Sequence, residues 1–216
     1  MTLSTFAQRY YPGAIQMPGP VGNVYPQQNA VEGVVCHSAD GNWSDAYTPM
    51  DTMIQRGVSF PFTVFKSGVV WQHYPLDASC WHAGGMEWNT RLVGIEHEGE
   101  ATEPLTEAQI VASVALVRWI AHTAGWPALT RGVTLREHNE LYVTACPSGR
   151  IPWHRYTLPA VPTPLPGGEF LPEPDLADVA KFWAAVAGGN VSPDVEITPV
   201  KAKRAGWEAY LVEVKQ

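Results

Sequence analysis

Residues 92–127 read LVGIEHEGEATEPLTEAQIVASVALVRWIAHTAGWP, and this stretch predicts a strand followed by a helix. Its first six residues form a short apolar run typical of a buried strand. Thr106 with Gln109 three residues later is a capping-box pattern, so the helix should begin after Thr106. Gly125-Trp126-Pro127 should end it. Apolar residues on several faces predict that this helix is buried on most sides: Ile110, Val114, Leu116, Val117, Trp119, Ile120 and Ala121.

Further strands are expected before this stretch. Residues 31–37 have the pattern of a short buried strand. Two β-prone runs, 60–65 and 69–74, flank a Lys-Ser-Gly turn and predict a hairpin, in which Pro61 should place part of the first run at an edge or a bulge. Residues 1–30 show little periodicity and are interpreted as an irregular N-terminal wrap. Strands combined with a buried helix predict an α/β sheet domain.

The bulk composition predicts one well-packed domain with some length to spare, since the chain has 216 residues, 45% hydrophobic and 16% charged. A formal net charge of −7 argues against nucleic-acid partners. The first ten residues lack the basic start and apolar core of a secretory signal, and no apolar run approaches the roughly 20 residues of a membrane helix. We therefore expect a protein made in the cytoplasm with no stable membrane association.

The last quarter of the chain has a different character. Residues 157–174 contain six prolines and are interpreted as a stiff linker between a main domain, 1–156, and a C-terminal segment, 175–216. That segment should begin with a short amphipathic helix, form a basic turn at residues 201–204 and end with a strand at 210–214. Because it is too short for a confident independent core, we interpret it as an accessory segment.

Three residues along the chain have the side chains of a catalytic metal site. A catalytic zinc needs three ligands from histidine, cysteine or carboxylate and one open position. His37 stands at a predicted strand end, and His138 is followed after seven residues by Cys146. On spacing alone the alternatives stay open, because a lone strand-end histidine is commonly structural and a lone buried cysteine is commonly inert. An odd number of cysteines without a signal peptide argues against a disulfide framework, which leaves at least one thiol free.

Five short motifs occur in register from about residue 30 to about residue 153. In order they are Val-Val-Cys-His ending at His37, the Phe-Lys-Ser-Gly turn, Trp-His-Ala-Gly around His82, Val-Gly-Ile-Glu ending at Glu96, and, after His138, Thr-Ala-Cys-Pro around Cys146. Together they resemble the N-acetylmuramoyl-L-alanine amidase family, which includes phage endolysins, bacterial recycling amidases and animal peptidoglycan-recognition proteins. The resemblance implies a mixed central β-sheet flanked by helices, with zinc in a surface groove.

The resemblance also implies roles for individual residues. The zinc ligands would be His37, His138 and Cys146, and Glu96 would be the general base. Cys36 is a poor ligand, because neighbouring residues in a strand point to opposite faces.

Two positions differ from parts of the family. Phe60 stands where some phage members have a tyrosine thought to assist catalysis, which favours Glu96 as the base. Thr144 stands where some members have a lysine; as the second catalytic group it could donate only a neutral hydrogen bond. His82 is expected to contact substrate, with a structural role as the alternative. Two sets have no assigned function: the histidines His73, His97, His122 and His154, and the glutamates Glu98, Glu100 and Glu103, which are interpreted as solvated.

The resemblance implies one catalytic Zn²⁺ and hydrolysis of the amide between N-acetylmuramic acid and L-alanine, in peptidoglycan or a muropeptide. We expect a phage endolysin that reaches the cell wall through a host membrane lesion; a cytoplasmic recycling enzyme is the close alternative. Other classes are a non-catalytic peptidoglycan-binding protein of the same fold and a phage structural protein with a vestigial site. Cys146 favours the enzyme, because non-catalytic relatives typically lose this cysteine. The C-terminal segment either packs on the domain or binds cell wall through Trp183, Trp207 and Tyr210.

Overall fold

A computed structural model of the protein describes residues 6, 8–44, 47–157, 197–204 and 207–214. The chain divides into two compact units, Met1–Pro159 and Ala160–Gln216. The elements of the first unit are, in chain order, β1 (Ala14–Gln16), β2 (Val24–Gln28), β3 (Gly33–Ser38), α1 (Pro49–Arg56), β4 (Phe62–Val64), β5 (Val70–Gln72), β6 (Ala78–Cys80), α2 (Met86–Asn89), β7 (Leu92–His97), α3 (Glu107–Ala124), β8 (Leu135–Glu137), the 3₁₀ helix η1 (His138–Glu140) and α4 (Trp153–Tyr156). The second unit contains β9 (Ile197–Arg204) and β10 (Trp207–Val214).

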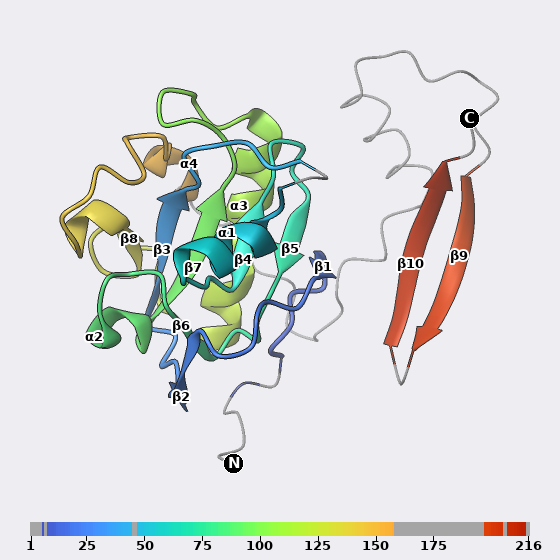
Figure 1. Ribbon diagram of the computed structural model, residues 1–216, viewed down its shortest axis with the longest axis horizontal. Coiled ribbons are helices and arrows are strands. Elements are labelled where there is room, and N and C mark those ends of the chain that lie inside the picture. Colours follow the sequence, from blue (N-terminus) through green and yellow to red (C-terminus); the bar gives the residue numbers. More distant parts are fainter. Residues whose placement is uncertain (1–5, 7, 45–46, 158–196, 205–206, 215–216) are drawn as a thin grey trace. The chain divides into compact units, whose positions relative to one another are not determined.

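A six-stranded mixed sheet forms the centre of the first unit (Figure 1). Its strand order is β1-β5-β4-β7-β3-β8. Neighbouring strands run parallel except β4 and β5, which form the antiparallel hairpin expected from the sequence. β2 and β6 pair antiparallel in a separate two-stranded sheet. The predicted α/β fold with a mixed central sheet is therefore confirmed.

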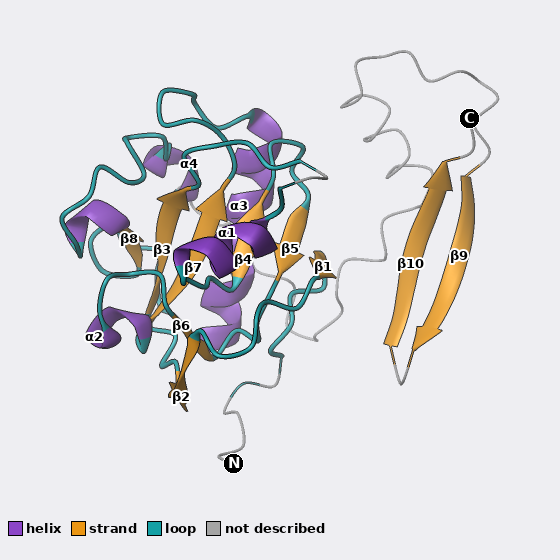
Figure 2. Ribbon diagram, in the orientation of Figure 1, coloured by secondary structure: helices purple, strands orange, loops and turns teal. Residues whose placement is uncertain are grey.

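Helices cover both faces of the central sheet: α1 lies in front of it and α3 behind it in the view of Figure 2. Buried side chains of three strands form one hydrophobic core with α3: Val34, Cys36, Phe62, Val64, Val93, Ile95, Leu116, Val117 and Ile120. Because side chains alternate along a strand, the same strands present their other residues to the α1 face. This division decides which side chains can meet at a site.

The longest helix, α3, begins and ends as predicted. The Thr106 hydroxyl accepts a hydrogen bond from the Gln109 amide, and the Gln109 side chain accepts one from the Thr106 amide, both at 3.1 Å. Gly125 ends the helix in the left-handed region, with φ 69°. The prediction that α3 is buried on most sides is confirmed, because its exposed residues occupy one narrow face of the helix: Glu107, Val111, Ala115 and His122.

Two expectations for the first half of the chain need correction. Residues 1–30 are not wholly irregular, since β1 pairs in parallel with β5 and β2 pairs with β6. Pro61 does not mark an edge or a bulge: β4 begins at Phe62 and lies between β5 and β7. The Pro61 carbonyl accepts a hydrogen bond from the His73 amide at 2.8 Å. A proline placed just before the strand withholds no N–H from the ladder of β4.

The described part of the second unit is an antiparallel hairpin, with Ile197 opposite Val214 and Arg204 opposite Trp207. The strand expected at residues 210–214 is part of β10. Residues 201–204 lie within β9, so the basic turn expected there is wrong. The helix expected near the start of the C-terminal segment, and Trp183 with it, lie outside the described residues. Within the described part of the chain, no helix combines the length and apolarity needed to cross a membrane.

His73, buried in the first unit, should make the stability of the fold depend on pH. Its Nδ1 lies 2.8 Å from the Met17 carbonyl oxygen and its Nε2 2.9 Å from the Thr63 hydroxyl. Burial lowers the pKa of His73 to about 4, whereas an unfolded histidine has a pKa of about 6.5. The unfolded chain therefore binds a proton that the native state excludes. The free energy of unfolding should fall as pH decreases from about 6.5 towards 4, and this group should have little effect above that window.

Between pH 7 and pH 5, the unfolding free energy of His73→Gln should fall by about 2 kcal/mol less than that of the wild-type protein. Urea unfolding at the two pH values measures this difference. His154→Gln is the matched control, because His154 is exposed and should leave the pH dependence unchanged. The same pH dependence in the wild-type protein and in His73→Gln would show that His73 does not carry the effect.

Candidate active site

Three neighbouring parallel strands end at one edge of the sheet and carry predicted site residues. His37 of β3 lies directly in register with Glu96 of β7. On its other side β3 pairs with β8, and His138 follows the last residue of β8. The carboxyl ends of parallel strands are the usual place for sites in open α/β sheets. The fold thus brings together residues that are far apart in the sequence.

Strand alternation separates these residues from the core. Cys36 and Ile95 belong to the core shared with α3, so their neighbours His37 and Glu96 face the opposite side of the sheet. Burial also raises the pKa of the Cys36 thiol. His97 points towards α3 as well, where its Nε2 lies 2.8 Å from the Ser113 hydroxyl. The structure thus excludes Cys36 from the site, as the sequence predicts, and it also turns His97 away from Glu96.

A loop after η1 returns the chain to this edge and places Cys146 beside both histidines. The potential ligand atoms of His37, His138 and Cys146 all lie within 4.8 Å of one another. Cys146 Sγ is 3.8 Å from His37 Nδ1, and the ring centroids of His37 and His138 are 4.5 Å apart. A tetrahedral zinc with usual bond lengths holds its nitrogen and sulfur ligands roughly 3.6 Å apart. The three side chains are therefore spaced to hold one such ion.

The chemistry of the donor atoms also fits a cation. Nε2 of His138 is buried and finds no hydrogen-bond partner in the described part of the chain, a costly state that a metal would relieve. Cys146 Sγ accepts a hydrogen bond from the Ser38 amide at 3.2 Å. Burial raises the pKa of the Cys146 thiol to about 12, with the Glu96 carboxylate adding to the effect. A thiolate here thus needs a neighbouring positive charge, which a bound metal ion supplies.

Glu96 lies next to this cluster. Its Oε1 is 4.0 Å from His37 Nδ1, and its Oε2 is buried and has no hydrogen-bond partner among the residues that the structure describes. Burial raises the pKa of Glu96 to about 8, against the opposing effect of the Arg56 and Arg150 charges. A cation at the cluster would lower this pKa. A buried carboxyl group with a raised pKa and an unused oxygen is suited to proton transfer.

The cluster opens into a cavity of about 310 Å³. Its lining combines buried residues, His37, Thr52, Phe60 and His82, with exposed ones, Asp40, Arg56, Ala145 and Ser148. Phe60 thus presents an apolar ring to the cavity and has no proton to offer there.

Thr144 lines the same cavity. Its Oγ1 accepts a hydrogen bond from the Cys146 amide at 3.2 Å, so the hydroxyl proton can be donated to a bound molecule. The structure therefore places all six predicted site residues, His37, His82, Glu96, His138, Thr144 and Cys146, around one cavity.

His82 has an arrangement that the sequence did not reveal. It is 7% exposed, and both ring nitrogens already have protein partners. Nδ1 lies 3.1 Å from His37 Nε2, and Nε2 lies 3.1 Å from the Leu92 carbonyl oxygen. His82 therefore lines the cavity, but neither ring nitrogen is available to substrate unless one of these bonds breaks.

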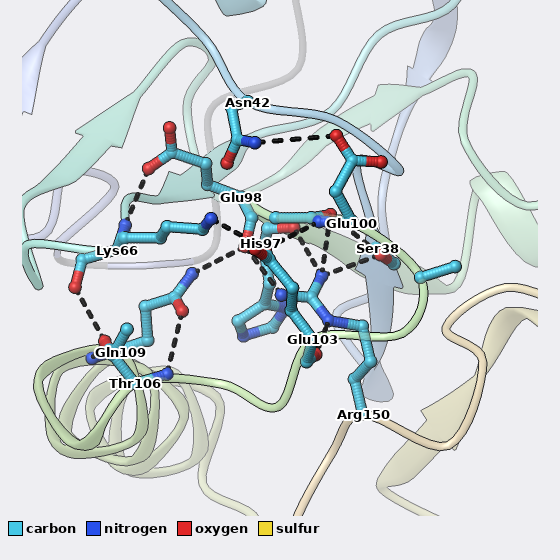
Figure 3. Close-up of polar contacts among 12 residues, drawn as sticks. Ser38, Asn42, Lys66, His97, Glu98, Glu100, Glu103, Thr106, Gln109 and Arg150 are labelled. Carbon is cyan, nitrogen blue, oxygen red and sulfur yellow. Dashed lines mark hydrogen bonds and ion pairs between the residues drawn. The ribbon is translucent and has the colours of Figure 1, made fainter.

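Arg150 is a structural residue of the site that the sequence analysis missed (Figure 3). Its guanidinium donates hydrogen bonds to the Ser38 hydroxyl at 2.7 Å and to four carbonyl oxygens, those of His97, Glu98, Gly99 and Glu103, at 2.6–3.2 Å. Arg150 thus joins the ends of β3 and β7 to the loop that carries Cys146. A lone arginine four residues after a cysteine has no sequence signal for this role.

The carboxylates near Glu96 are engaged in structural contacts. The interpretation of Glu98 as solvated is wrong: it is 8% exposed and accepts hydrogen bonds from the amides of Trp43 at 3.2 Å and Lys66 at 2.7 Å. Glu103 pairs with the Lys66 ammonium at 2.6 Å. Glu137 accepts a hydrogen bond from the Trp153 indole at 2.5 Å. Of these glutamates and Glu96, only Glu96 lines the cavity.

Several solved structures share this fold. One is an endolysin N-acetylmuramoyl-L-alanine amidase from Clostridium intestinale, with 23% identity, a TM-score of 0.54, and coverage of 68% of this chain and 95% of that chain. Peptidoglycan recognition protein-LE, solved in complex with tracheal cytotoxin, has 18% identity, a TM-score of 0.53, and coverage of 69% and 95%. An endolysin of a Thermus scotoductus bacteriophage has 19% identity, a TM-score of 0.51, and coverage of 63% and 89%. At these identities the likeness shows the fold.

Comparisons of sequence give the family. No curated protein matches the chain. A family profile described as N-acetylmuramoyl-L-alanine amidase matches residues 27–149, a segment that contains every predicted site residue. Because this match covers more than half of the chain, the protein belongs to the N-acetylmuramoyl-L-alanine amidase family.

Proposed function

We propose that the protein is a zinc-dependent hydrolase that cleaves the amide between N-acetylmuramic acid and L-alanine in peptidoglycan. The observation that carries this proposal is the grouping of the ligand atoms of His37, His138 and Cys146 within 4.8 Å, beside a glutamate whose buried Oε2 has no hydrogen-bond partner within the described ranges. Two imidazoles and a thiolate leave the fourth position of a tetrahedral ion open, as catalytic zinc requires.

The positions of the protein groups support the following roles. Zinc bound by His37, His138 and Cys146 would supply Lewis acidity, which polarises a carbonyl and acidifies water. Glu96 accepts a proton from the attacking water and transfers it to the amide nitrogen as that nitrogen leaves. A new carbon–oxygen bond forms and the carbon–nitrogen bond breaks, which yields the lactyl carboxylate and a free L-alanine amine.

The position of the Thr144 hydroxyl supports a part for it in this reaction. The hydroxyl lines the cavity. Its oxygen accepts a hydrogen bond from the Cys146 amide, so its own proton remains free to be donated. It can therefore donate to the carbonyl oxygen of the amide as negative charge develops there. A neutral donor stabilises that charge less than a lysine would, so Glu96 carries the larger share of catalysis in this proposal.

A second candidate function is peptidoglycan binding without cleavage. The fold of peptidoglycan recognition protein-LE, solved with a peptidoglycan fragment, keeps this alternative open. The intact ligand set and Glu96 favour the enzyme, because binding alone needs neither an open metal position nor a base.

Product analysis distinguishes these functions. The purified protein should release peptides with a free L-alanine amine from purified cell walls, detected by mass spectrometry, and leave intact N-acetylmuramic acid on the glycan. Release of reducing sugars, or of peptides cut elsewhere, would assign another bond. Binding of walls without any release would support the recognition protein.

The size of the preferred substrate distinguishes a phage endolysin from a recycling enzyme. We propose a phage endolysin that reaches the wall through a host membrane lesion, and the endolysins among the fold relatives support this. An endolysin should cleave intact sacculi, whereas a recycling enzyme should act on soluble muropeptides and leave sacculi nearly untouched.

A further inference from the structure

The His82 ring connects a backbone carbonyl to a predicted metal ligand. Its Nε2 lies 3.1 Å from the Leu92 carbonyl oxygen, and its Nδ1 lies 3.1 Å from His37 Nε2. The two rings stand nearly perpendicular, at 88°, with centroids 5.2 Å apart. His82 therefore contacts His37 on the side of the ring away from Cys146 and Glu96.

These contacts determine where the protons lie. A carbonyl oxygen can only accept, so His82 Nε2 must carry a hydrogen. Within the residues that the structure describes, the buried ring has no carboxylate among its hydrogen-bond partners and is therefore neutral, which leaves its Nδ1 as an acceptor. His37 must then donate from Nε2. The lone pair of His37 consequently lies on Nδ1, the atom 3.8 Å from Cys146 Sγ and 4.0 Å from Glu96 Oε1.

The surrounding chain holds His82 in this position. The Asn89 side-chain oxygen accepts hydrogen bonds from the His82 amide at 3.1 Å and the Ala83 amide at 2.7 Å. Gly94 of β7 lies against the ring, and a Cβ at Gly94 would come within 2.7 Å of His82 Cγ. The position therefore needs a glycine beneath the ring, and α2 and β7 together fix the imidazole.

We infer that His82 is a positioning residue: it fixes His37 in the Nε2–H tautomer and so keeps the Nδ1 lone pair available to the metal. This inference rests on the proposed ligand role of His37. It replaces the expected substrate contact of His82, because both ring nitrogens are used within the protein. Groups that orient a ligating histidine in this way typically change metal affinity by 10- to 100-fold when they are lost.

The first test uses the metal-free protein. Long-range ¹H–¹⁵N NMR correlation of the imidazoles should show both His37 and His82 protonated at Nε2 and unprotonated at Nδ1. A proton on His37 Nδ1 would overturn the inference. This measurement requires neither bound zinc nor catalytic turnover, so a protein that cleaves no peptidoglycan could still support or contradict it.

Two substitutions then separate proton placement from packing. His82→Phe keeps a ring of similar size but has no acceptor, and it should weaken zinc binding by about 10- to 100-fold in competition with a chelator. His82→Asn loses ring volume but places an oxygen near the former Nδ1, so it should stay within about threefold of the wild-type affinity. If His82 only fills space, the order reverses, with Phe near wild type and Asn weaker. That order, or equal affinity in both variants, would refute the inference.

Discussion

Replacing Glu96 with Gln should lower the turnover of wall-derived substrate by about 100-fold or more and leave zinc bound. The amide has nearly the shape of the carboxylate but cannot take the proton of the attacking water. Glu96 is not among the three predicted ligands, so metal content should stay near that of the wild-type protein. Steady-state kinetics on a soluble muropeptide and elemental analysis of the same preparation measure the two quantities.

Glu137→Gln is the matched control for this experiment. The Glu137 carboxylate already accepts from the Trp153 indole, and its other oxygen lies 3.6 Å from the Arg131 guanidinium. Turnover should therefore change little in Glu137→Gln. Near-normal turnover in Glu96→Gln would instead move the base to Glu137 or to solvent, and Glu137→Gln would then show which of these acts.

The sequence predicted the strands that carry the candidate site residues because these central elements have strong local patterns. Side chains alternate between the core and the site along residues 31–37 and 92–97. This alternation alone places Cys36 in the core and His37 on the opposite face. The parallel pairing of β3 with β7 then sets His37 beside Glu96. The capping box at Thr106 likewise depends only on residues three apart, and it formed as predicted.

Elements defined by distant partners could not be predicted in this way. β1 has three residues and exists because it pairs with β5, more than fifty positions later in the chain. Which face of α3 is exposed likewise depends on the side that meets the sheet, and Val111 at 49% exposure shows that an apolar residue need not mark the buried side. Helical spacing identifies the helix but does not say which narrow face stays exposed.

The buried polar groups show the same limit. Glutamate and arginine usually lie on protein surfaces, yet Glu98 and Arg150 are both less than 9% exposed. Backbone groups of separate segments make hydrogen bonds with their charged side chains. For His82, the sequence indicates a place near the site but cannot show that both nitrogens are occupied. The acceptor on one side is a backbone carbonyl, and backbone groups leave no trace in residue identity.

Removing the metal should abolish hydrolysis, and Cys146→Ser should lose both metal and activity. A serine hydroxyl is a much weaker zinc ligand than a thiolate, and the remaining histidines cannot hold a catalytic ion tightly by themselves. Chelator treatment of the wild-type protein should also lower its melting temperature, because metal bound only by the native state stabilises it. Elemental analysis, activity after zinc is restored, and thermal unfolding provide the three measurements.

Cys36→Ala is the control that makes this result specific. Cys36 directly precedes His37 in the sequence, but its side chain faces the core formed with α3 and cannot reach the ligand cluster that contains Cys146. Cys36→Ala should therefore lower stability through the lost core packing and keep one zinc per chain. Metal lost from Cys36→Ala but retained in Cys146→Ser would contradict the alternation of β3. A wild-type protein that takes up no metal from zinc-replete buffer would refute the proposed mechanism, since Glu96 would then have no activated water from which to take a proton.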